Sequence, residues 1–344
     1  MTSAITVNGH IPVMMHEVVT SLNPRDGGIY VDGTFGRGGY SQAILEAAAT
    51  QVFGIDRDPA ATTFGAELSD KYDGRLTVLE GCFGDMTDLM AAAGVAKVDG
   101  VTLDLGVSSP QIDDPVRGFS FRFAGPLDMR MSGAGPTAAD FVNQAPEEEI
   151  ADVIYNYGEE RYARKIARAI VAGRENNPIL STTQLVTIIH GIVRRSKDGI
   201  DSATRTFMAL RIQVNDEFGE LERGLVGAEK ILAPFGRLAV VSFHSLEDRQ
   251  VKSFLHEHSG AMGRGSRHLP DNPDAVPVPS FTLVKRGAIK PGKDEAAQNP
   301  RARSARLRVA ERNDAPAWPD IAGEERRRGE CDRRQYSHFY SQPS

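Results

Sequence analysis

The sequence of 344 residues has two cysteines, Cys82 and Cys331, and no uncharged apolar run close to the roughly 18 residues that a membrane-spanning helix requires. Two cysteines exclude a disulfide scaffold and a four-cysteine zinc site. The first residues lack a basic region followed by an apolar core, so no secretory signal is recognisable. These absences predict a cytoplasmic protein of the size of an enzyme.

An excess of basic charge over the whole chain is also missing, because the formal net charge is −6. This balance argues against a protein that binds nucleic acid over its entire surface. Two stretches differ: residues 158–212 contain ten basic and five acidic side chains, and residues 281–312 contain nine and three. Each stretch is either a local anion-binding face or an ordinary solvated surface, and charge alone leaves both interpretations open.

The first hundred residues contain a regular alternation of short apolar runs and helical segments. Such alternation is typical of an α/β fold with a parallel sheet and right-handed crossovers. The expected strands are 29–31, 52–55, 76–79 and 100–103, and the expected helices are 40–49, 59–68 and 86–93.

This alternation stops after residue 112. Residues 113–146 are rich in Gly, Pro and Asp, and helical signals follow, with a capping box at 181–184 and apolar residues from Phe207 to Leu225 on one face of a longer stretch. Strand character returns at 237–241. We predict a discontinuous sheet domain (1–112 and 216–312), an inserted helical domain (113–215) and a flexible charged tail (313–344).

A glycine-rich turn, residues 32–39, follows the first expected strand. It lacks the ending of a P-loop and a strict G-x-G-x-x-G, so ATP hydrolysis is not expected. Asp32 precedes the turn, and Asp56 ends the second strand, where a carboxylate typically accepts ribose hydroxyls. The Asp32 carboxylate would repel a pyrophosphate and attract a ligand with an amino group and a sulfonium. The pair therefore favours S-adenosylmethionine over NAD.

Two later strands are followed by Phe83 and Asp104. Ligands of open α/β sheets lie beyond the carboxyl ends of the strands, so we expect these side chains to share one crevice with Asp32 and Asp56.

Several motifs resemble those of one known family, the bacterial 16S (small-subunit) ribosomal RNA cytosine-N4 methyltransferases, which modify a cytosine of the decoding centre. The similar segments run in order from about residue 10 to 312 and together are specific. They are residues 9–14 (GHIPVM), 31–39 (VDGTFGRGG), 54–59 (GIDRDP), 104–111 (DLGVSSPQ), 117–120 (RGFS), 127–131 (LDMRM), 242–249 (SFHSLEDR) and 299–301 (NPR).

The resemblance implies a Rossmann-like methyltransferase sheet with an inserted helical domain that helps to bind RNA. The family usually has histidine where this chain has Tyr40, a change that keeps the backbone N–H. The implied contacts with S-adenosyl-L-methionine come from Gly38, Gly39, Tyr40, Asp56, Phe83, Asp104 and Gln111.

The chemistry expected of such an enzyme starts from the exocyclic amine of cytosine, a poor nucleophile whose lone pair is delocalised into the ring. It needs an acceptor for an N–H that turns the lone pair toward the methyl group. Asp104, or Ser109 in the turn that follows, is a candidate, although Asp104 is equally a candidate for recognising the adenine or methionine part of the cofactor. The base must also leave its stack, and Phe119, Phe121 and Phe123 are either its platform or a half-buried strand.

Rival functions find weaker support. Ser242, His244, Ser245 and Asp248 lie within seven residues and lack a nucleophile elbow, so a hydrolase is disfavoured and a polar loop on the substrate side is preferred. His256 and His258 lack a second ligand cluster for a metal. A degenerate, non-catalytic ribosome-assembly factor and an NAD-dependent dehydrogenase remain as alternatives, which S-adenosylmethionine binding separates from the methyltransferase.

The RNA is expected to bind the two basic stretches, since phosphate contacts set affinity and register. The candidate residues are Arg161, Arg164, Lys165 and Arg168 in the insertion, and Arg301, Arg303, Arg306 and Arg308 near the end.

Overall fold

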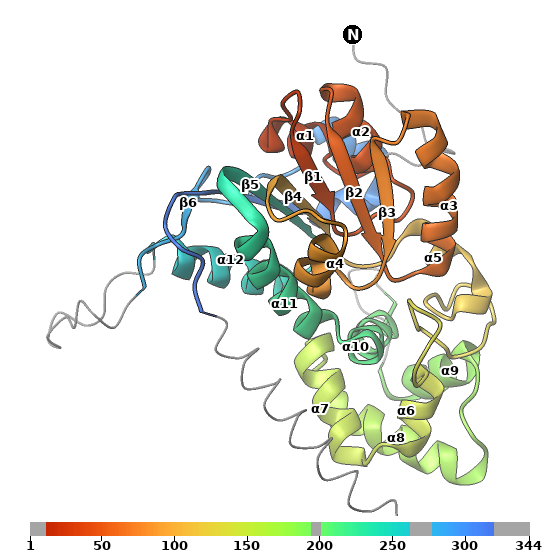
Figure 1. Cartoon of the computed structure of the whole chain (residues 1–344). Helices are drawn as coiled ribbons and strands as arrows, with labels where there is room; N and C mark the ends of the chain where they lie inside the picture. Colours follow the sequence, from red (N-terminus) through yellow and green to blue (C-terminus); the bar gives the residue numbers. More distant parts are fainter. Residues whose placement is uncertain (1–11, 194–200, 262–276, 320–344) are drawn as a thin grey trace, which may run out of the picture.

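The structure, a computed structural model, describes residues 12–193, 201–261 and 277–319. These residues form a sheet covered by helices and a second group of helices beside it (Figure 1). The sheet order is β3-β2-β1-β4-β5-β7-β6. The strands are β1 Ile29–Asp32, β2 Gln51–Asp56, β3 Leu76–Glu80, β4 Val98–Asp104, β5 Leu232–Ser242, β6 Phe281–Leu283 and β7 Arg306–Arg312.

Strands β1 to β5 pair in parallel, which confirms the predicted Rossmann-like α/β class. Strand β7 is antiparallel to both β5 and β6, so the sheet is mixed. After β5 the chain crosses over to the sheet edge as β6 and then returns as β7 into the position between them. A mixed edge on a parallel sheet is common in doubly wound folds.

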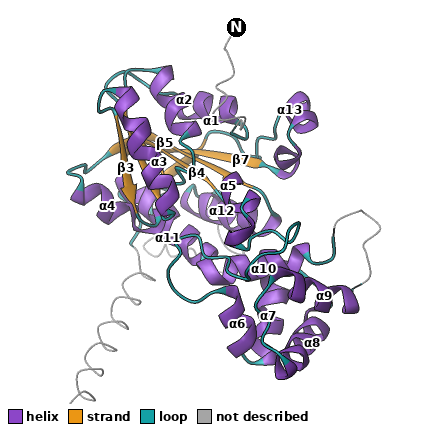
Figure 2. Ribbon diagram, turned by 90° about the vertical axis from the view of Figure 1, so that its right-hand side faces the viewer, coloured by secondary structure: helices purple, strands orange, loops and turns teal. Residues whose placement is uncertain are grey.

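Helices cover both faces of the sheet (Figure 2). Alternate residues of β5 serve the two layers: Ala239 and Val241 pack with α1, α2 and α3, whereas Leu238 and Val240 pack with α4, α11 and α12. The helices of these layers are α1 Met15–Leu22, α2 Gly39–Ala47, α3 Pro59–Ser69, α4 Met86–Ala92, α11 Glu217–Ile231 and α12 Ser245–His258.

The buried residues of a third hydrophobic cluster lie between positions 127 and 210, and none of these described residues belongs to a strand. Capping boxes start two of its helices, one with Thr137 and Asp140 and the other, as predicted, with Ser181 and Gln184. This helical body lies beside the sheet in both views (Figures 1 and 2). Its helices are α6 Ala138–Gln144, α7 Glu147–Gly158, α8 Ala163–Asn176, α9 Thr182–Ile192 and α10 Thr204–Asn215.

The apolar stretch from Phe207 to Leu225 is two helices, so the prediction of one continuous face is wrong. The chain breaks at Asp216, whose backbone is left-handed (φ 47°, ψ 43°). Aspartate tolerates this conformation, and both terminal nitrogens of Arg223 bond its carboxylate at 3.0 Å. The break separates α10, on the helical body, from α11, on the sheet.

Two smaller differences concern segments outside the helices. Residues 119–123 do not form a strand: Phe119 and Phe121 pack into the helical body, and Phe123 is exposed. Residues just beyond 312, expected to be flexible, contact the sheet domain through Trp318, whose indole donates to the Val278 carbonyl (2.8 Å). The remaining short helices are α5 Ser109–Asp113 and α13 Lys293–Gln298, with 3-10 turns η2 Phe83–Asp85, η3 Pro115–Arg117 and η4 Pro300–Ser304.

None of the helices within the described residues is long and apolar enough to cross a membrane.

Candidate active site

The carboxyl ends of the parallel strands open onto a cavity of about 710 Å³. Its other walls come from α10, α11, the start of α12 and the η4 segment. Most of the residues predicted from the sequence line it, namely Gly39, Tyr40, Asp56, Phe83, Asp104, Ser109 and Gln111. Gly38 is the left-handed residue (φ 68°) directly before α2.

The glycine turn passes close beneath this cavity. Gly36 has a left-handed backbone (φ 53°), and its N–H donates to Asp56 Oδ2 at 2.7 Å. A Cβ at Gly39 would lie 2.2 Å from Pro12 Cγ, so only glycine fits there. Helix α2 (Gly39–Ala47) begins at this point, where the N–H groups of the first turn have no acceptor further along the helix.

Asp32 differs from expectation, because it is fully buried and does not line the cavity. Its carboxylate accepts hydrogen bonds from the Ser41 hydroxyl (2.8 Å) and N–H (3.2 Å) and from the Thr34 N–H (3.4 Å). Burial raises its pKa to about 6, although these donors act against the rise. Asp32 therefore holds the two ends of the glycine turn together and does not face a ligand.

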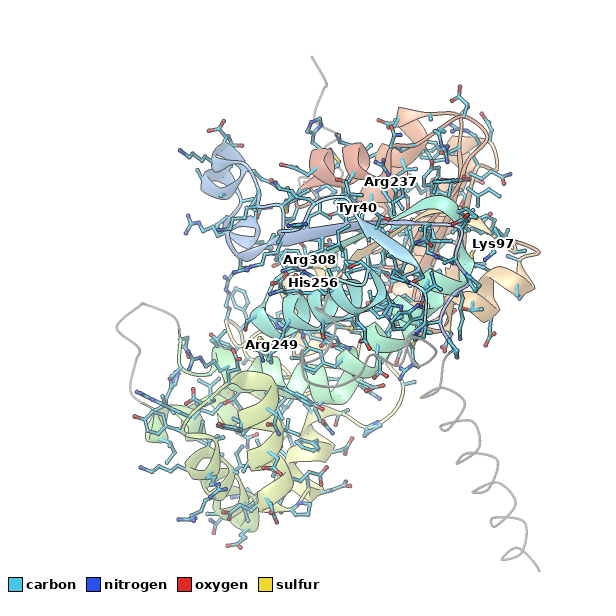
Figure 3. All side chains as sticks on the ribbon, turned by 90° about the vertical axis from the view of Figure 1, so that its left-hand side faces the viewer. Tyr40, Lys97, Arg237, Arg249, His256 and Arg308 are labelled. Atoms are coloured by element: carbon cyan, nitrogen blue, oxygen red, sulfur yellow. The ribbon has the colours of Figure 1, made fainter. Side chains whose placement is uncertain are left out.

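The Tyr40 ring is also buried, and its hydroxyl donates to the carbonyl of Val13 (Figure 3 labels its position). The side chain thereby ties the segment before α1 to α2. For hydrogen bonding to a ligand, Tyr40 therefore offers only its backbone, at the start of α2.

Asp104, like Asp56, lines the cavity. It is held by a hydrogen bond from its N–H to the Thr34 hydroxyl (2.7 Å). Its Oδ1 is buried and has no hydrogen-bond partner among the described residues. Burial, followed by the nearby charges of Asp32 and Glu247, raises the pKa of Asp104 well above its ordinary value. A buried, unpartnered carboxyl in a cavity is a group placed for a ligand.

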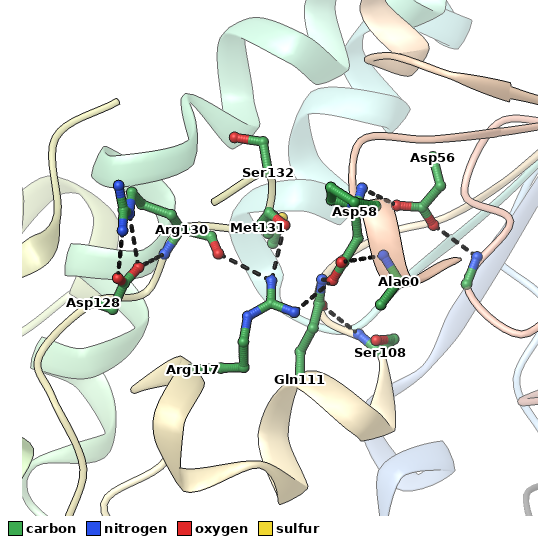
Figure 4. A network of polar contacts seen from close by, with 12 residues as sticks. Asp56, Asp58, Ala60, Ser108, Gln111, Arg117, Asp128, Arg130, Met131 and Ser132 are labelled. Carbon is green, nitrogen blue, oxygen red and sulfur yellow. Dashed lines mark hydrogen bonds and ion pairs between the residues drawn. The ribbon is translucent and has the colours of Figure 1, made fainter. Parts of the chain in front are cut away.

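A polar network joins Asp56 to the residues after β4 (Figure 4). Asp56 Oδ1 accepts from the Asp58 N–H (2.8 Å), and Asp58 Oδ2 accepts from Gln111 Nε2 and Arg117 Nη1, both at 2.8 Å. Gln111 Oε1 in turn accepts from the Ser108 N–H (3.0 Å). Gln111 is thus fixed at the cavity wall by the acid two residues beyond Asp56.

Arg117 also links the sheet to the helical body. Besides Asp58, it donates from Nη2 to the carbonyls of Arg130 (3.1 Å) and Met131 (2.8 Å). A second arginine, Arg57, donates to the carbonyl of Asn215 (2.8 Å) and pairs with buried Glu220. The two bodies are therefore joined at the rim of the cavity.

The cavity contains functional candidates that the sequence did not suggest: Met208 and Arg211 on α10 and Glu217 and Phe218 on α11. Arg211 donates to both oxygens of Glu217 (2.7 and 2.9 Å). The sequence pattern counted Phe218 in the apolar face that continues from α10. The signal that could have separated it is Asn215-Asp216, a pair that favours a left-handed break.

His244 and Glu247, at the start of α12, complete this wall. His244 Nε2 lies 2.9 Å from Glu247 Oε1, and its Nδ1 accepts from the Glu247 N–H (3.4 Å). Burial would raise the pKa of Glu247, but the contact with His244 and the charges of His244 and Arg211 hold it below its ordinary value. The expected polar loop on the substrate side is therefore an ordered helix cap.

The hydrolase alternative finds no support in this geometry. The Ser242 hydroxyl donates to the Arg306 carbonyl (3.4 Å), and Ser245 donates to Glu159 (3.0 Å). Asp248 accepts two hydrogen bonds from Arg308 (2.7 and 3.0 Å). These side chains therefore turn to separate partners.

The C-terminal arginines divide into different environments. Arg301 lines the cavity and donates to the Ser109 hydroxyl, and Arg308 is nearly buried in its pair with Asp248. Arg303 and Arg306 are exposed. Figure 3 places Arg308 beside α12 and Arg249 near the junction with the helical body. The hypothesis of four equivalent phosphate contacts here is therefore reduced to two exposed side chains.

The two histidines near the end of α12 do not form a metal site. His258 lies 3.0 Å from Glu229 and stacks between Phe254 and Trp318, with ring centroids 4.0 and 4.1 Å apart. No group of three potential metal ligands occurs in the part of the chain that the structure describes.

Comparison with known proteins gives a consistent result. Residues 7–313 match the model of the MraW methylase family. The chain is 62% identical over 308 residues to "Ribosomal RNA small subunit methyltransferase H" of Rhodospirillum centenum, covering 90% of this chain and 93% of that one. It is 57% identical to the protein of the same name from Paramagnetospirillum magneticum, covering 91% and 98%.

Proposed function

This chain belongs to the MraW methylase family of S-adenosylmethionine-dependent methyltransferases, and we propose that it methylates the exocyclic N4 of one cytosine in the decoding centre of 16S ribosomal RNA. The substrate is this RNA within the small ribosomal subunit, in the cytoplasm. The relatives are named as small-subunit ribosomal RNA methyltransferases, and we extend that activity to this chain. The observation that carries it is the buried, unpartnered Asp104 carboxyl, which faces the same cavity as the glycine turn.

The cavity fits S-adenosylmethionine on its own features. A carboxyl oxygen without a partner suits a cationic ligand, and a glycine-rich turn allows a ligand to approach its backbone closely. We assign the binding role to the backbone at Gly38, Gly39 and Tyr40 and to Asp56, Phe83, Asp104 and Gln111. When bound, the cofactor supplies a methyl group on a sulfonium, which is an electrophile without need of a metal.

The chain must then orient the amine of cytosine and accept a proton from it. Asp104 is suited to accept an N–H hydrogen bond, because its Oδ1 has no other partner in the described residues. Ser109 lies at the start of α5, and its hydroxyl accepts a hydrogen bond from Arg301 at the same cavity wall. Both residues are assigned to positioning the amine, so that the nitrogen lone pair points toward the methyl group.

The proposal is tested with the labelled methyl cofactor and three acceptors: purified small subunits, purified large subunits and free 16S RNA. Label in the small-subunit RNA, mapped by nuclease digestion to a decoding-centre fragment, is the expected result. Label confined to large subunits, or to another region of 16S RNA, would refute the assigned substrate.

A further inference from the structure

The cavity has a second side that the cofactor contacts do not use. The cofactor side consists of the glycine turn and the ends of β2, β3 and β4. The opposite side comes from α10, α11 and the start of α12, with Met208, Phe218 and His244 among its lining residues. Asp104, at the end of the central strand β4, lines the same cavity and is close enough to Asp32 on one side and Glu247 on the other for both charges to raise its pKa. A second ligand on the far side could therefore reach Asp104 as well.

Phe218 is the aromatic residue of this cavity that is least used by the fold. The other phenylalanine rings of the lining, Phe35, Phe83 and Phe243, belong to or pack against the two clusters of the sheet. Phe218 is half-buried and belongs to none of the three clusters formed by the described residues. Its ring is consequently free of a role in core packing.

Neighbouring rings nevertheless hold Phe218 in place. Tyr157 of α7 contacts it with ring centroids 5.4 Å apart and planes at 78°, and His244 does so at 5.9 Å and 68°. Gln250 Nε2 donates to the Phe218 carbonyl (3.0 Å) and fixes the backbone. Neither ring lies parallel to Phe218, so no ring of the protein stacks on it among these contacts.

His244 contributes a ring that Glu247 fixes in place. Nδ1 accepts the Glu247 N–H, and Nε2 lies 2.9 Å from Glu247 Oε1 without hydrogen-bond geometry. Arg211 Nη2 lies 4.0 Å from the same carboxylate. Because Glu247 holds this ring against Phe218, His244 acts as a positioning residue for Phe218.

We propose that Phe218 is the stacking platform for the extruded pyrimidine base, held in orientation by His244 and Tyr157. This inference rests on the proposed function and specifies how its substrate is held. An extruded base needs an aromatic or apolar surface to replace its lost stacking. Of the rings named from the sequence, Phe119 and Phe121 pack in the helical body, and Phe123 is exposed and does not line the cavity. Phe218 offers that surface on the wall that also carries Met208, in the cavity that Asp104 lines.

The test is photochemical cross-linking, because 5-iodocytosine cross-links to an aromatic ring stacked on it. Small subunits assembled from RNA that carries 5-iodocytosine are irradiated with the full-length protein, and the cross-linked peptide is identified by mass spectrometry. We expect a decoding-centre cytosine joined to Phe218. The cross-link should disappear in Phe218→Ala and persist in Phe218→Tyr. A cross-link of that cytosine to a ring elsewhere overturns the proposal.

Kinetics supply the second readout. Phe218→Ala should lower kcat/KM for methyl transfer by roughly 5- to 150-fold, the range typical of lost base stacking, while S-adenosylmethionine affinity by calorimetry stays unchanged. Phe235→Ala is the matched control, because Phe235 is 65% exposed and does not line the cavity. Phe218→Leu, which keeps the apolar volume, serves if Phe218→Ala fails to fold, with an intermediate loss expected. Wild-type kcat/KM in either variant overturns the platform.

Different results would refute the platform and the proposed function. If the wild-type protein methylates a cytosine at N4 but the cross-link lies elsewhere, only the platform is wrong. If the wild-type protein transfers no methyl group to any cytosine, the proposed function is wrong and the platform falls with it.

Discussion

At the scale of single residues, Asp104 carries the most chemical information. Burial raises its pKa well above the ordinary value, because it disfavours the charged form of the carboxyl. A cationic ligand beside it would stabilise the carboxylate and lower that pKa. Binding of the cofactor and ionisation of Asp104 are therefore linked.

We predict that S-adenosylmethionine binding releases a proton from Asp104, and that affinity rises with pH until the pH reaches the raised pKa of this group. Calorimetry in buffers of different ionisation enthalpy measures the released protons. Asp104→Asn, which cannot ionise, should abolish the dependence on buffer. An apparent enthalpy that is identical in all buffers for the wild-type protein would contradict the linkage.

Asp56 is predicted to act on the same ligand by a different contact. Asp56→Ala should weaken S-adenosylmethionine binding by about 1–3 kcal/mol, because ribose hydroxyls lose a charged acceptor and Gly36 loses its partner. Calorimetry gives the affinity, and Asp56→Asn, which keeps a carbonyl acceptor, should lose less. Equal affinity of Asp56→Ala and wild type would exclude the contact.

The cysteines separate methylation at N4 from methylation at C5. Attack at C5 requires a cysteine nucleophile on C6 of the ring. Cys82 is not among the residues that line the cavity, and Cys331 lies outside the described residues. Replacing both by serine should leave methyl transfer close to the wild-type rate. A folded, cofactor-binding double variant without turnover would support the C5 mechanism instead.

At the scale of elements, the parallel strands and the glycine turn were predictable because they are local. Each expected strand from 29 to 103 is present within a few residues, since short apolar runs bounded by turns have few alternative structures. Asp56 and Asp104, at the ends of two of these strands, line the common cavity as the parallel topology predicts. The exception is Asp32, whose side chain turns away from the cavity, because alternate residues of a strand face opposite sides.

The other wall of the cavity was not predictable in the same way. Apolar periodicity counts Phe218 with Phe207 and Leu210, and only the left-handed break at Asp216 separates them. The arginines Arg301 and Arg308 look like a solvated basic strand in sequence. In the structure they meet Ser109 and Asp248, partners 192 and 60 residues away. Contacts over such distances in sequence leave no local pattern.

Helix α8 is the element that we predict to bind RNA. Arg161, at its start, and Arg164, Lys165 and Arg168 within it are all exposed. Replacing the four by alanine should weaken RNA binding and lower the slope of log affinity against log salt by up to about 3, while leaving cofactor affinity unchanged. Binding titrations at several salt concentrations measure this slope.

The matched control for this variant is Arg308→Ala. Its pair with Asp248 is nearly buried, so its loss should lower the melting temperature and leave the salt dependence of RNA binding as in the wild type. A wild-type slope in the α8 variant would mean that this face does not contact RNA.

At the level of the whole molecule, the candidate active site lies where the two bodies meet. The sheet and its covering helices supply the glycine turn, Asp56, Asp104 and Phe218 of α11, and the helical body supplies Met208 of α10. Arg57 and Arg117 join the bodies with hydrogen bonds across the rim. On a chain with a net charge of −6, a local cluster of basic residues such as that of α8 would favour a single orientation of the RNA.

We propose that a methyl group is transferred to N4 of cytosine in this cavity. The most direct measurement is nucleoside analysis by mass spectrometry of small-subunit RNA after incubation with the protein and methyl-labelled S-adenosylmethionine. We predict that the label appears as N4-methylcytidine and that Asp104→Ala abolishes it. Label recovered as 5-methylcytidine, or in a nucleoside other than cytidine, would contradict the account.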